Sequence, residues 1–125
     1  MESNLKLLVI DDNSRDRVLV QEAIKTSGLG LEIIFAQSGE EGILQVNKLK
    51  PACIVALDTR LSGIDGFETC RRIKEIDENI KVIIYTGIVD AVDASKARAA
   101  GADDFCVKTA DGAPLINALK DLIGP

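Results

Sequence analysis

Five polar residues stand where short apolar runs of the sequence end: Asp11, Asp12, Asp58, Thr86 and Lys108. If those runs are parallel strands of one sheet, their carboxyl ends meet at one edge, where open α/β sheets bind ligands. Three carboxylates held close together repel one another and need a cation. Ligands that are all oxygens, with room for water and a phosphoryl oxygen, suit Mg²⁺ better than Ca²⁺.

Together these residues predict a phosphoryl-transfer site. A metal ion and the Lys108 ammonium would neutralise the oxygens of the transferring group, and Thr86 would donate a hydrogen bond to one of them. Asp58 would attack in line and give an aspartyl phosphate. Each residue also has a plain structural alternative, as a helix cap, a turn residue or a solvated surface lysine. Their convergence on one edge favours the site.

The positions of these residues depend on a regular alternation of strands and helices. The apolar runs cover residues 5–10, 31–36, 52–57, 80–85 and 104–107, and they are rich in Val, Ile and Leu. Runs without polar alternation are typical of strands buried on both faces of a parallel sheet. Segments with helical periodicity separate them, so we predict a doubly wound α/β fold with helices on both faces.

Signals for helix ends support this alternation. The first helix is expected to end at Gly28. The second begins at Ser38, which forms a capping box with Glu41 whose hydroxyl and carboxylate satisfy free backbone N–H groups, and it stops before Pro51. A fourth helix, about residues 89–100, is rich in Ala and has little contrast between an apolar and a polar face.

The length, charge and residue composition of the chain exclude several classes of function. The 125 residues predict one domain over 1–125 with no output domain in this chain. A net charge of −5 argues against direct binding of nucleic acid. The chain has no His, which excludes Ser-His-Asp and Cys-His pairs, zinc–imidazole sites and a phosphohistidine on this chain. The chemistry is therefore left to carboxylates, Lys, hydroxyls and a metal ion.

The three cysteines, Cys53, Cys70 and Cys106, contain no C-x-x-C pair and are odd in number. They are expected to be core residues of a reduced, cytoplasmic protein rather than a disulfide framework or zinc site. The longest unbroken apolar run has only six residues, 52–57, and Met1-Glu2-Ser3-Asn4 lacks the basic start of a signal peptide. We expect no membrane segment and no secretion.

Four motifs around the site residues resemble the receiver domains of two-component response regulators, with a CheY-like single-domain layout. They are Val9-Ile10-Asp11-Asp12, the segment 57–66 (LDTRLSGIDG), Tyr85-Thr86-Gly87 and the segment 101–108 (GADDFCVK). One such motif would be weak evidence, but all four occur in order and at the right spacing. The resemblance spans residues 5–123.

The resemblance implies a flavodoxin-like (βα)5 fold with five parallel strands in the order 2-1-3-4-5. It also implies that Asp58 is the phosphoacceptor and that Lys108 contacts the phosphoryl group. Mg²⁺ would be held by Asp11, Asp12 and Asp58 together with the backbone carbonyl of Arg60. The phosphodonor would be a histidine kinase or a phosphotransfer protein.

Thr86 and Phe105 match the switch pair of the family. On phosphorylation the hydroxyl would turn toward the phosphate, and the aromatic ring would rotate into the space it leaves. This change would alter which protein binds the face formed by the fourth helix, fifth strand and fifth helix. The downstream partner is unknown from the sequence, and we expect a monomer or weak dimer.

The chain departs from the family at two positions, because Ser62 and Thr109 stand where the family usually has Pro. The lysine–proline bond of the family is typically cis, and a cis bond before Thr109 would cost roughly 2.5–4 kcal/mol. The geometry of the Lys108–Thr109 bond is therefore left open. Arg60 and Ile88 are expected to border the mouth of the site, where Ile88 either restricts the attacking water or merely packs on the fourth helix.

The leading functional hypothesis is a signalling switch, which catalyses only its own phosphotransfer and autodephosphorylation and is not otherwise an enzyme. A second hypothesis is a phosphatase or mutase of the haloacid-dehalogenase type. That class needs an acid two residues after the nucleophile, where this chain has Arg60, and a cap domain. A third is a receiver-like scaffold that takes no phosphate. The sequence also leaves open whether the natural protein is a longer DNA-binding regulator or hybrid kinase.

Overall fold

The computed structural model describes residues 5–88 and 90–124, in which five parallel strands alternate with five helices. The strands are β1 (Lys6–Ile10), β2 (Glu32–Ala36), β3 (Cys53–Leu57), β4 (Lys81–Thr86) and β5 (Asp104–Val107). The helices are α1 (Ser14–Ser27), α2 (Gly39–Leu49), α3 (Gly66–Ile76), α4 (Ala91–Ala99) and α5 (Ala113–Ile123). The sheet order is β2-β1-β3-β4-β5, which confirms the order implied by the resemblance.

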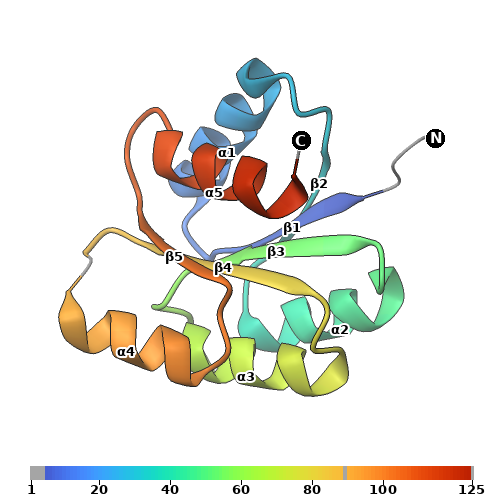
Figure 1. Cartoon of the computed structure of the whole chain (residues 1–125), viewed down its shortest axis with the longest axis vertical. Coiled ribbons are helices and arrows are strands. Elements are labelled where there is room, and N and C mark those ends of the chain that lie inside the picture. Colours follow the sequence, from blue (N-terminus) through green and yellow to red (C-terminus); the bar gives the residue numbers. More distant parts are fainter. Residues whose placement is uncertain (1–4, 89, 125) are drawn as a thin grey trace.

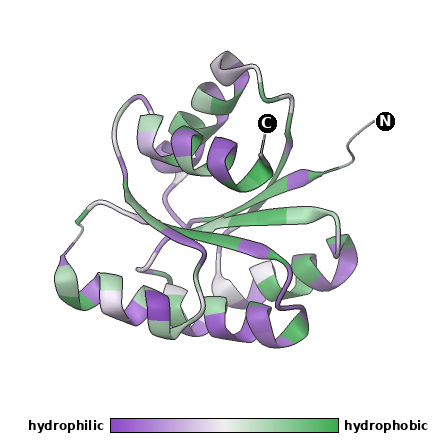
Figure 2. Cartoon of the chain, viewed as in Figure 1, coloured by the Kyte–Doolittle hydropathy of each residue, from purple (hydrophilic) through white to green (hydrophobic). Residues whose placement is uncertain are grey.

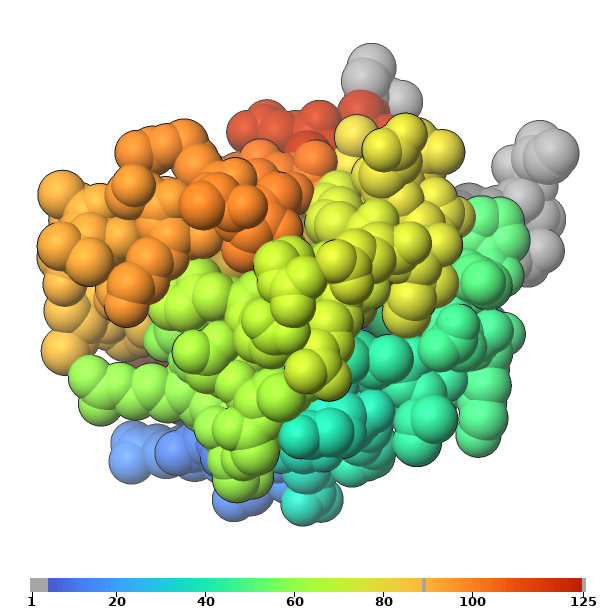
Figure 3. All heavy atoms as spheres, turned by 90° about the horizontal axis from the view of Figure 1, so that it is seen from below, coloured from blue at the N-terminus to red at the C-terminus, as the bar shows by residue number. Residues whose placement is uncertain are grey.

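The helices lie on both faces of the sheet, as predicted. Helices α1 and α5 cover one face, and α2, α3 and α4 cover the other (Figure 1). Seen from the second side, α3 lies between α2 and α4 (Figure 3). Each crossover helix carries the chain back to the end of the sheet where the strands begin. The carboxyl ends of all strands therefore lie together at the opposite end.

The core has two halves, one on each face of the sheet. Along β1, Leu7 and Val9 belong to the half under α1 and α5, whereas Leu8 and Ile10 belong to the half under α2, α3 and α4. All four are fully buried. This alternation explains why the strands are apolar along most of their length, and Figure 2 shows a largely hydrophobic sheet between helices that carry both hydrophilic and hydrophobic residues.

Strand and helix boundaries follow the predicted signals closely. Strands β1, β2 and β3 begin one residue later than the apolar runs, and β4 is shifted by one residue at both ends. Helix α1 ends at Gly28, whose φ of 77° is the left-handed conformation that glycine adopts at low cost. The Ser38 hydroxyl caps α2 at the Glu41 N–H, but the Glu41 carboxylate accepts from Gln37 rather than from Ser38.

Helix α4 is the least buried helix, as its sequence suggested. It begins after Asp90, whose side chain accepts from the Asp93 N–H, and Ala97 is its one buried residue. By comparison, α5 buries four residues between its ends. The predicted helix included Val89, which lies outside the described residues.

The positions of Cys53 and Cys70 agree with the prediction of core residues. Cys53 and Cys70 are buried, Cys106 is half-buried, and all three are free. Burial raises the pKa of Cys70 to about 11 and of Cys106 to about 12, which keeps these thiols protonated and unreactive near neutral pH. None of the helices in the described part of the chain combines the length and apolar character that a membrane crossing requires.

Candidate functional site

The strand register brings the predicted acidic residues together. Ile10 at the end of β1 pairs with Leu57 at the end of β3, so Asp11 and Asp58 leave neighbouring strands at the same level. The Asp58 N–H donates to the Ile10 carbonyl over 3.0 Å, which continues the ladder by one step. Candidate ligand oxygens of Asp11, Asp12 and Asp58 all lie within 4.8 Å of one another. Asp11 is fully buried, Asp58 is 8% exposed and Asp12 faces solvent.

Lys108 follows β5 and reaches the same cluster. Its backbone N–H donates to the Thr86 carbonyl over 2.7 Å, which fixes the Lys108 backbone beside β4. Its ammonium lies 2.9 Å from Asp11 Oδ2, 2.7 Å from Asp16 Oδ2 and 3.2 Å from Asp58 Oδ2. One cation thus serves three carboxylates, while Asp12 adds a fourth negative charge nearby.

Tyr85 contacts both Asp11 and Lys108 of the site. Its hydroxyl donates to Asp11 Oδ2 over 2.7 Å, and its ring centroid lies 4.8 Å from Lys108 Nζ. The other oxygen of Asp11 accepts from the Asn13 N–H over 3.0 Å. Three of the roughly four lone pairs of the Asp11 carboxylate are therefore already engaged.

The local electrostatics follow from burial and from this shortage of positive charge. Burial raises the pKa of Asp58; Lys108 opposes that rise, and the charge of Asp11 adds to it. Burial lowers the pKa of Lys108, but hydrogen bonds to Asp16 and Asp11 outweigh it and hold the pKa above its usual value. Burial, followed by the charge of Asp11, raises the pKa of Tyr85 and keeps its hydroxyl protonated. The site therefore holds excess negative charge beside a permanent ammonium.

The loop after β3 holds Asp58 in place. The Thr59 N–H donates to Asp58 Oδ1 over 2.8 Å, and the Gly66 N–H donates to the Thr59 carbonyl over 3.0 Å. A Cβ on Gly66 would lie 2.0 Å from the Asp58 carbonyl oxygen, so only glycine allows this close approach of α3. Asp65 caps α3 by accepting from the Glu68 N–H.

The predicted switch residues occupy different surroundings. Thr86 ends β4 and is buried, and its hydroxyl lies 3.2 Å from the hydroxyl of Thr59. Phe105 is half-buried against the core half under α2, α3 and α4. The Lys108–Thr109 bond is trans, since Lys50–Pro51 is the only cis peptide bond within residues 5–88 and 90–124.

A cavity opens from the cluster to solvent. Asp58, Thr86 and Lys108 line it together with Arg60 and Ile88, which confirms that the last two border the mouth of the site. Ile88 is 60% exposed, and its effect on the attacking water stays a prediction. Asp93, in the first turn of α4, lines the same cavity.

The cluster has the composition that a hard divalent cation prefers. Asp11, Asp12 and Asp58 offer only oxygen, and the single ammonium leaves their charge uncompensated. The residues therefore fit Mg²⁺. The part of the Arg60 carbonyl as a fourth ligand stays a prediction.

Sequence reasoning missed three groups at the site. Asp16 reaches Lys108 from the first turn of α1, the Tyr85 hydroxyl reaches Asp11, and the Thr59 hydroxyl pairs with Thr86. The signal for Asp16 is its position five residues after Asp11 in the predicted helix. Tyr85 is the one tyrosine of the chain, and it stands in a strand of aliphatic residues.

Comparison with known proteins identifies the family. The family model of the response regulator receiver domain matches residues 7–120. The sporulation initiation phosphotransferase F of Bacillus subtilis is 38% identical over 95 residues, covering 74% of each chain. The transcriptional regulatory protein AfsQ1 of Streptomyces coelicolor is 37% identical over 106 residues, which are 85% of this chain but 45% of that protein.

A solved structure gives the same result. The response regulator receiver domain protein from Clostridium thermocellum superposes with a TM-score of 0.83 at 30% identity, covering 95% of this chain and 94% of that one. This chain spans less than half of AfsQ1, so the receiver part alone is compared there. On the family match over residues 7–120, this chain belongs to the receiver domains of two-component response regulators.

Proposed function

We propose that this receiver domain is a phosphorylation-activated switch in which Asp58 accepts a phosphoryl group from a histidine kinase or a phosphotransfer protein. The observation that carries the proposal is the position of Asp58, 3.2 Å from the Lys108 ammonium and with a ligand oxygen within 4.8 Å of those of Asp11 and Asp12. This places a nucleophilic carboxylate beside a permanent positive charge and a set of oxygen ligands for a cation.

The chain's own residues have distinct parts in the transfer. The bond between phosphorus and the donor nitrogen breaks, its electron pair stays on the nitrogen, and a carboxylate oxygen of Asp58 forms the new bond to phosphorus. Lys108 then donates a hydrogen bond to the phosphoryl oxygens. Mg²⁺, when bound by Asp11, Asp12, Asp58 and the Arg60 carbonyl, supplies positive charge against those oxygens.

The switch would start at Thr86. Its hydroxyl leaves Thr59 for a phosphoryl oxygen, and Phe105 turns into the space that becomes free. Helix α4 can follow at small cost, because Ala97 is its only buried residue among those described. Ile88 and Val92 are 60% and 64% exposed on this side, which supports a partner-binding face of α4, β5 and α5.

The chain acts on no separate substrate in this proposal, and it catalyses only its own phosphotransfer and autodephosphorylation. Arg60 stands where a phosphatase of the haloacid-dehalogenase type needs a second acid. With a net charge of −5, the receiver itself binds protein partners rather than nucleic acid. We propose that it works in the cytoplasm as a monomer or weak dimer; contact with DNA would belong to other parts of a longer regulator.

Phosphate incorporation tests the proposal. We expect wild-type protein incubated with acetyl phosphate and Mg²⁺ to gain the mass of one phosphoryl group, and Asp58→Asn to gain none. Asp121→Asn, which changes an exposed carboxylate on α5, is the matched control and should behave as wild type. Incorporation by both wild type and Asp58→Asn, or by neither, would contradict the assignment.

The switch needs a separate test. Beryllofluoride, a phosphoryl mimic, added with Mg²⁺ should change backbone amide signals in ¹H–¹⁵N spectra mainly in α4, β5 and α5. Thr86→Ala should bind the mimic but lose most of the changes in α4. Equal changes over the α1 and α2 surfaces would argue against the proposed face.

A further inference from the structure

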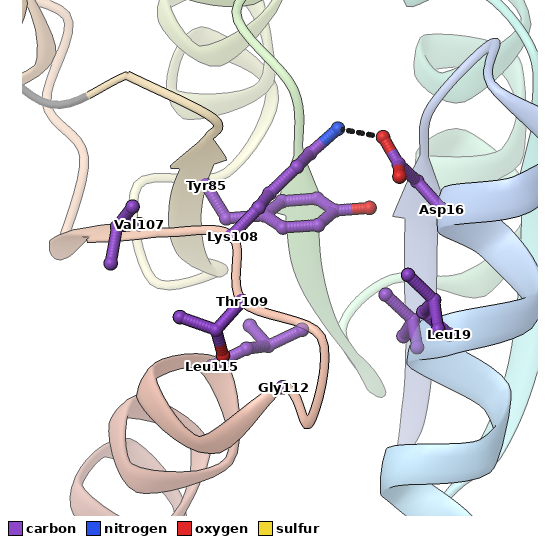
Figure 4. A pocket seen from close by; sticks show the side chains of 9 residues that line it. Asp16, Leu19, Tyr85, Val107, Lys108, Thr109, Gly112 and Leu115 are labelled. Carbon is purple, nitrogen blue, oxygen red and sulfur yellow. Dashed lines mark hydrogen bonds and ion pairs between the residues drawn. The ribbon is translucent and has the colours of Figure 1, made fainter.

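Of the three carboxylates that contact Lys108, Asp16 is the one outside the predicted metal set. Its Oδ2 lies 2.7 Å from Lys108 Nζ, the shortest of the three contacts of that ammonium (Figure 4). The candidate metal ligands are Asp11, Asp12 and Asp58, so a bound cation leaves Asp16 free to keep its partner.

The position of Asp16 is fixed by the start of α1. Its N–H donates to the side chain of Asn13, which caps the helix. The next residue, Arg17, donates from Nη1 to the Asp11 carbonyl over 2.8 Å and ties this first turn to the end of β1. The Asp16 carboxylate is thus held at the rim of the site rather than on a loose loop.

A cation and the ammonium compete for the same oxygens. Lys108 has three N–H donors, which are shared among Asp11, Asp16 and Asp58. Asp11 already accepts from Tyr85 and from the Asn13 N–H, so it has little capacity for both cations. When a divalent cation binds Asp11 and Asp58, its charge repels the ammonium and its bonds use their lone pairs.

We propose that Asp16 is a positioning residue that retains the Lys108 ammonium when a cation takes Asp11, and so keeps it near Asp58. The Lys108 backbone stays fixed by its hydrogen bond to the Thr86 carbonyl, so only the end of the side chain has to move. Asp16 acts through Lys108 and touches no reacting atom. The inference rests on the proposed function, because it assumes that Mg²⁺ and a phosphoryl group occupy this site.

Mg²⁺ affinity tests the competition without any phosphorylation. The amide signals of Asn13 and Thr59 report binding, because their N–H groups donate to the carboxylates of Asp11 and Asp58. We expect Asp16→Asn to weaken Mg²⁺ binding about fivefold, because the ammonium then stays on Asp11 and Asp58. Asp93→Asn removes a charge that lines the same cavity without touching Lys108, and it should change the affinity less than about twofold.

The Lys108→Met background shows whether Asp16 acts on Mg²⁺ affinity through the Lys108 ammonium or only through its own charge. Without the ammonium, Asp16→Asn and Asp93→Asn should have the same small effect on Mg²⁺ affinity. Equal effects of these two substitutions already in the wild-type background would overturn the proposal, as would an unchanged fivefold loss in Lys108→Met. The same spectra show whether each variant is folded.

The rate of phosphorylation by acetyl phosphate completes the test. At saturating Mg²⁺, Asp16→Asn should be phosphorylated about tenfold more slowly, and Asp16→Glu should recover most of the rate. A wild-type protein that takes no phosphate refutes the proposed function. A phosphorylated wild type with an equally fast or faster Asp16→Asn refutes only the positioning by Asp16.

Discussion

Two well-buried lysine side chains, Lys74 and Lys108, lie at opposite ends of the sheet, and their sites are built differently. Lys74 lies near the amino ends of β4 and β5, and Lys108 lies at their carboxyl ends. Their side chains are almost equally buried, at 15% and 16% exposure. Lys74 pairs with one carboxylate, Asp103, at 2.7 Å, and it also donates to the Ile80 carbonyl at 2.6 Å.

The amino-end site is balanced in charge. Asp103 Oδ2 accepts from Lys74 and also from the Val82 N–H at 2.8 Å, so one pair links α3 to the starts of β4 and β5. At the carboxyl end, Lys108 faces three carboxylates, two of which also belong to the predicted metal set. We expect the balanced pair to stabilise the fold, and the unbalanced cluster to reduce stability when no cation is bound.

Removing each ammonium tests this difference most strongly. Lys108→Met leaves Asp11 fully buried without its cation, and we expect a loss of about 3 kcal/mol in the free energy of unfolding without divalent ions. Mg²⁺ should restore much of that loss. Lys74→Met should cost about 1–2 kcal/mol, and Mg²⁺ should not restore it. Urea unfolding with Mg²⁺ and with EDTA measures both, and equal Mg²⁺ responses would remove the distinction.

Neutralising one carboxylate at each end should change stability in opposite directions. We expect Asp58→Asn to raise the free energy of unfolding by about 1 kcal/mol at pH 7.5, because it relieves repulsion, and Asp103→Asn to lower it by a similar amount. A loss of stability in both variants would show that the two ends are equivalent.

The stability that Asp58→Asn gains over wild type should depend on pH in a definite direction. Burial raises the pKa of Asp58 in the folded protein, so folding favours its protonated form. The stability from this group is present below the unfolded pKa and is lost as pH rises through the folded pKa. The advantage of Asp58→Asn over wild type should therefore be largest at neutral pH and shrink on acidification, as thermal unfolding across pH can measure.

The smallest effect is expected from adding charge to the unbalanced end. Ile88 borders the cavity over Asp58, and Ile88→Glu introduces another carboxylate there while opening the path for water. We expect the aspartyl phosphate to decay about threefold faster, equivalent to about 0.7 kcal/mol in activation free energy. Val92→Glu, on the exposed surface of α4, is the control. An unchanged decay rate in Ile88→Glu would exclude a shielding role for Ile88.

The fold and the predicted cluster follow from the sequence because they depend on strand ends. Parallel strands with buried faces must present their carboxyl ends together, and this alone places Asp11, Asp58 and Lys108 at one edge. The order of the strands came from the resemblance, since crossover lengths do not distinguish neighbours. Helix ends were predictable where Gly28, Ser38 and Pro51 give local signals.

The missed contacts depend on packing that sequence periodicity does not encode. Asp16 meets Lys108 only because α1 lies beside the end of β5, 92 residues away in sequence. The Tyr85 hydroxyl reaches from β4 past β3 to the end of β1, although its ring belongs to an apolar strand. Lys74 and Asp103 look like ordinary surface charges in sequence, and only the turn before β5 brings them together.

The Tyr85 hydrogen bond also provides an optical reporter. The chain has no tryptophan and one tyrosine, so its near-ultraviolet emission comes from a single ring whose hydroxyl donates to Asp11. We expect a cation that draws electron density from the Asp11 carboxylate to change that hydrogen bond and with it the emission of the ring. Occupancy of this site should then be measurable in unlabelled protein by tyrosine fluorescence.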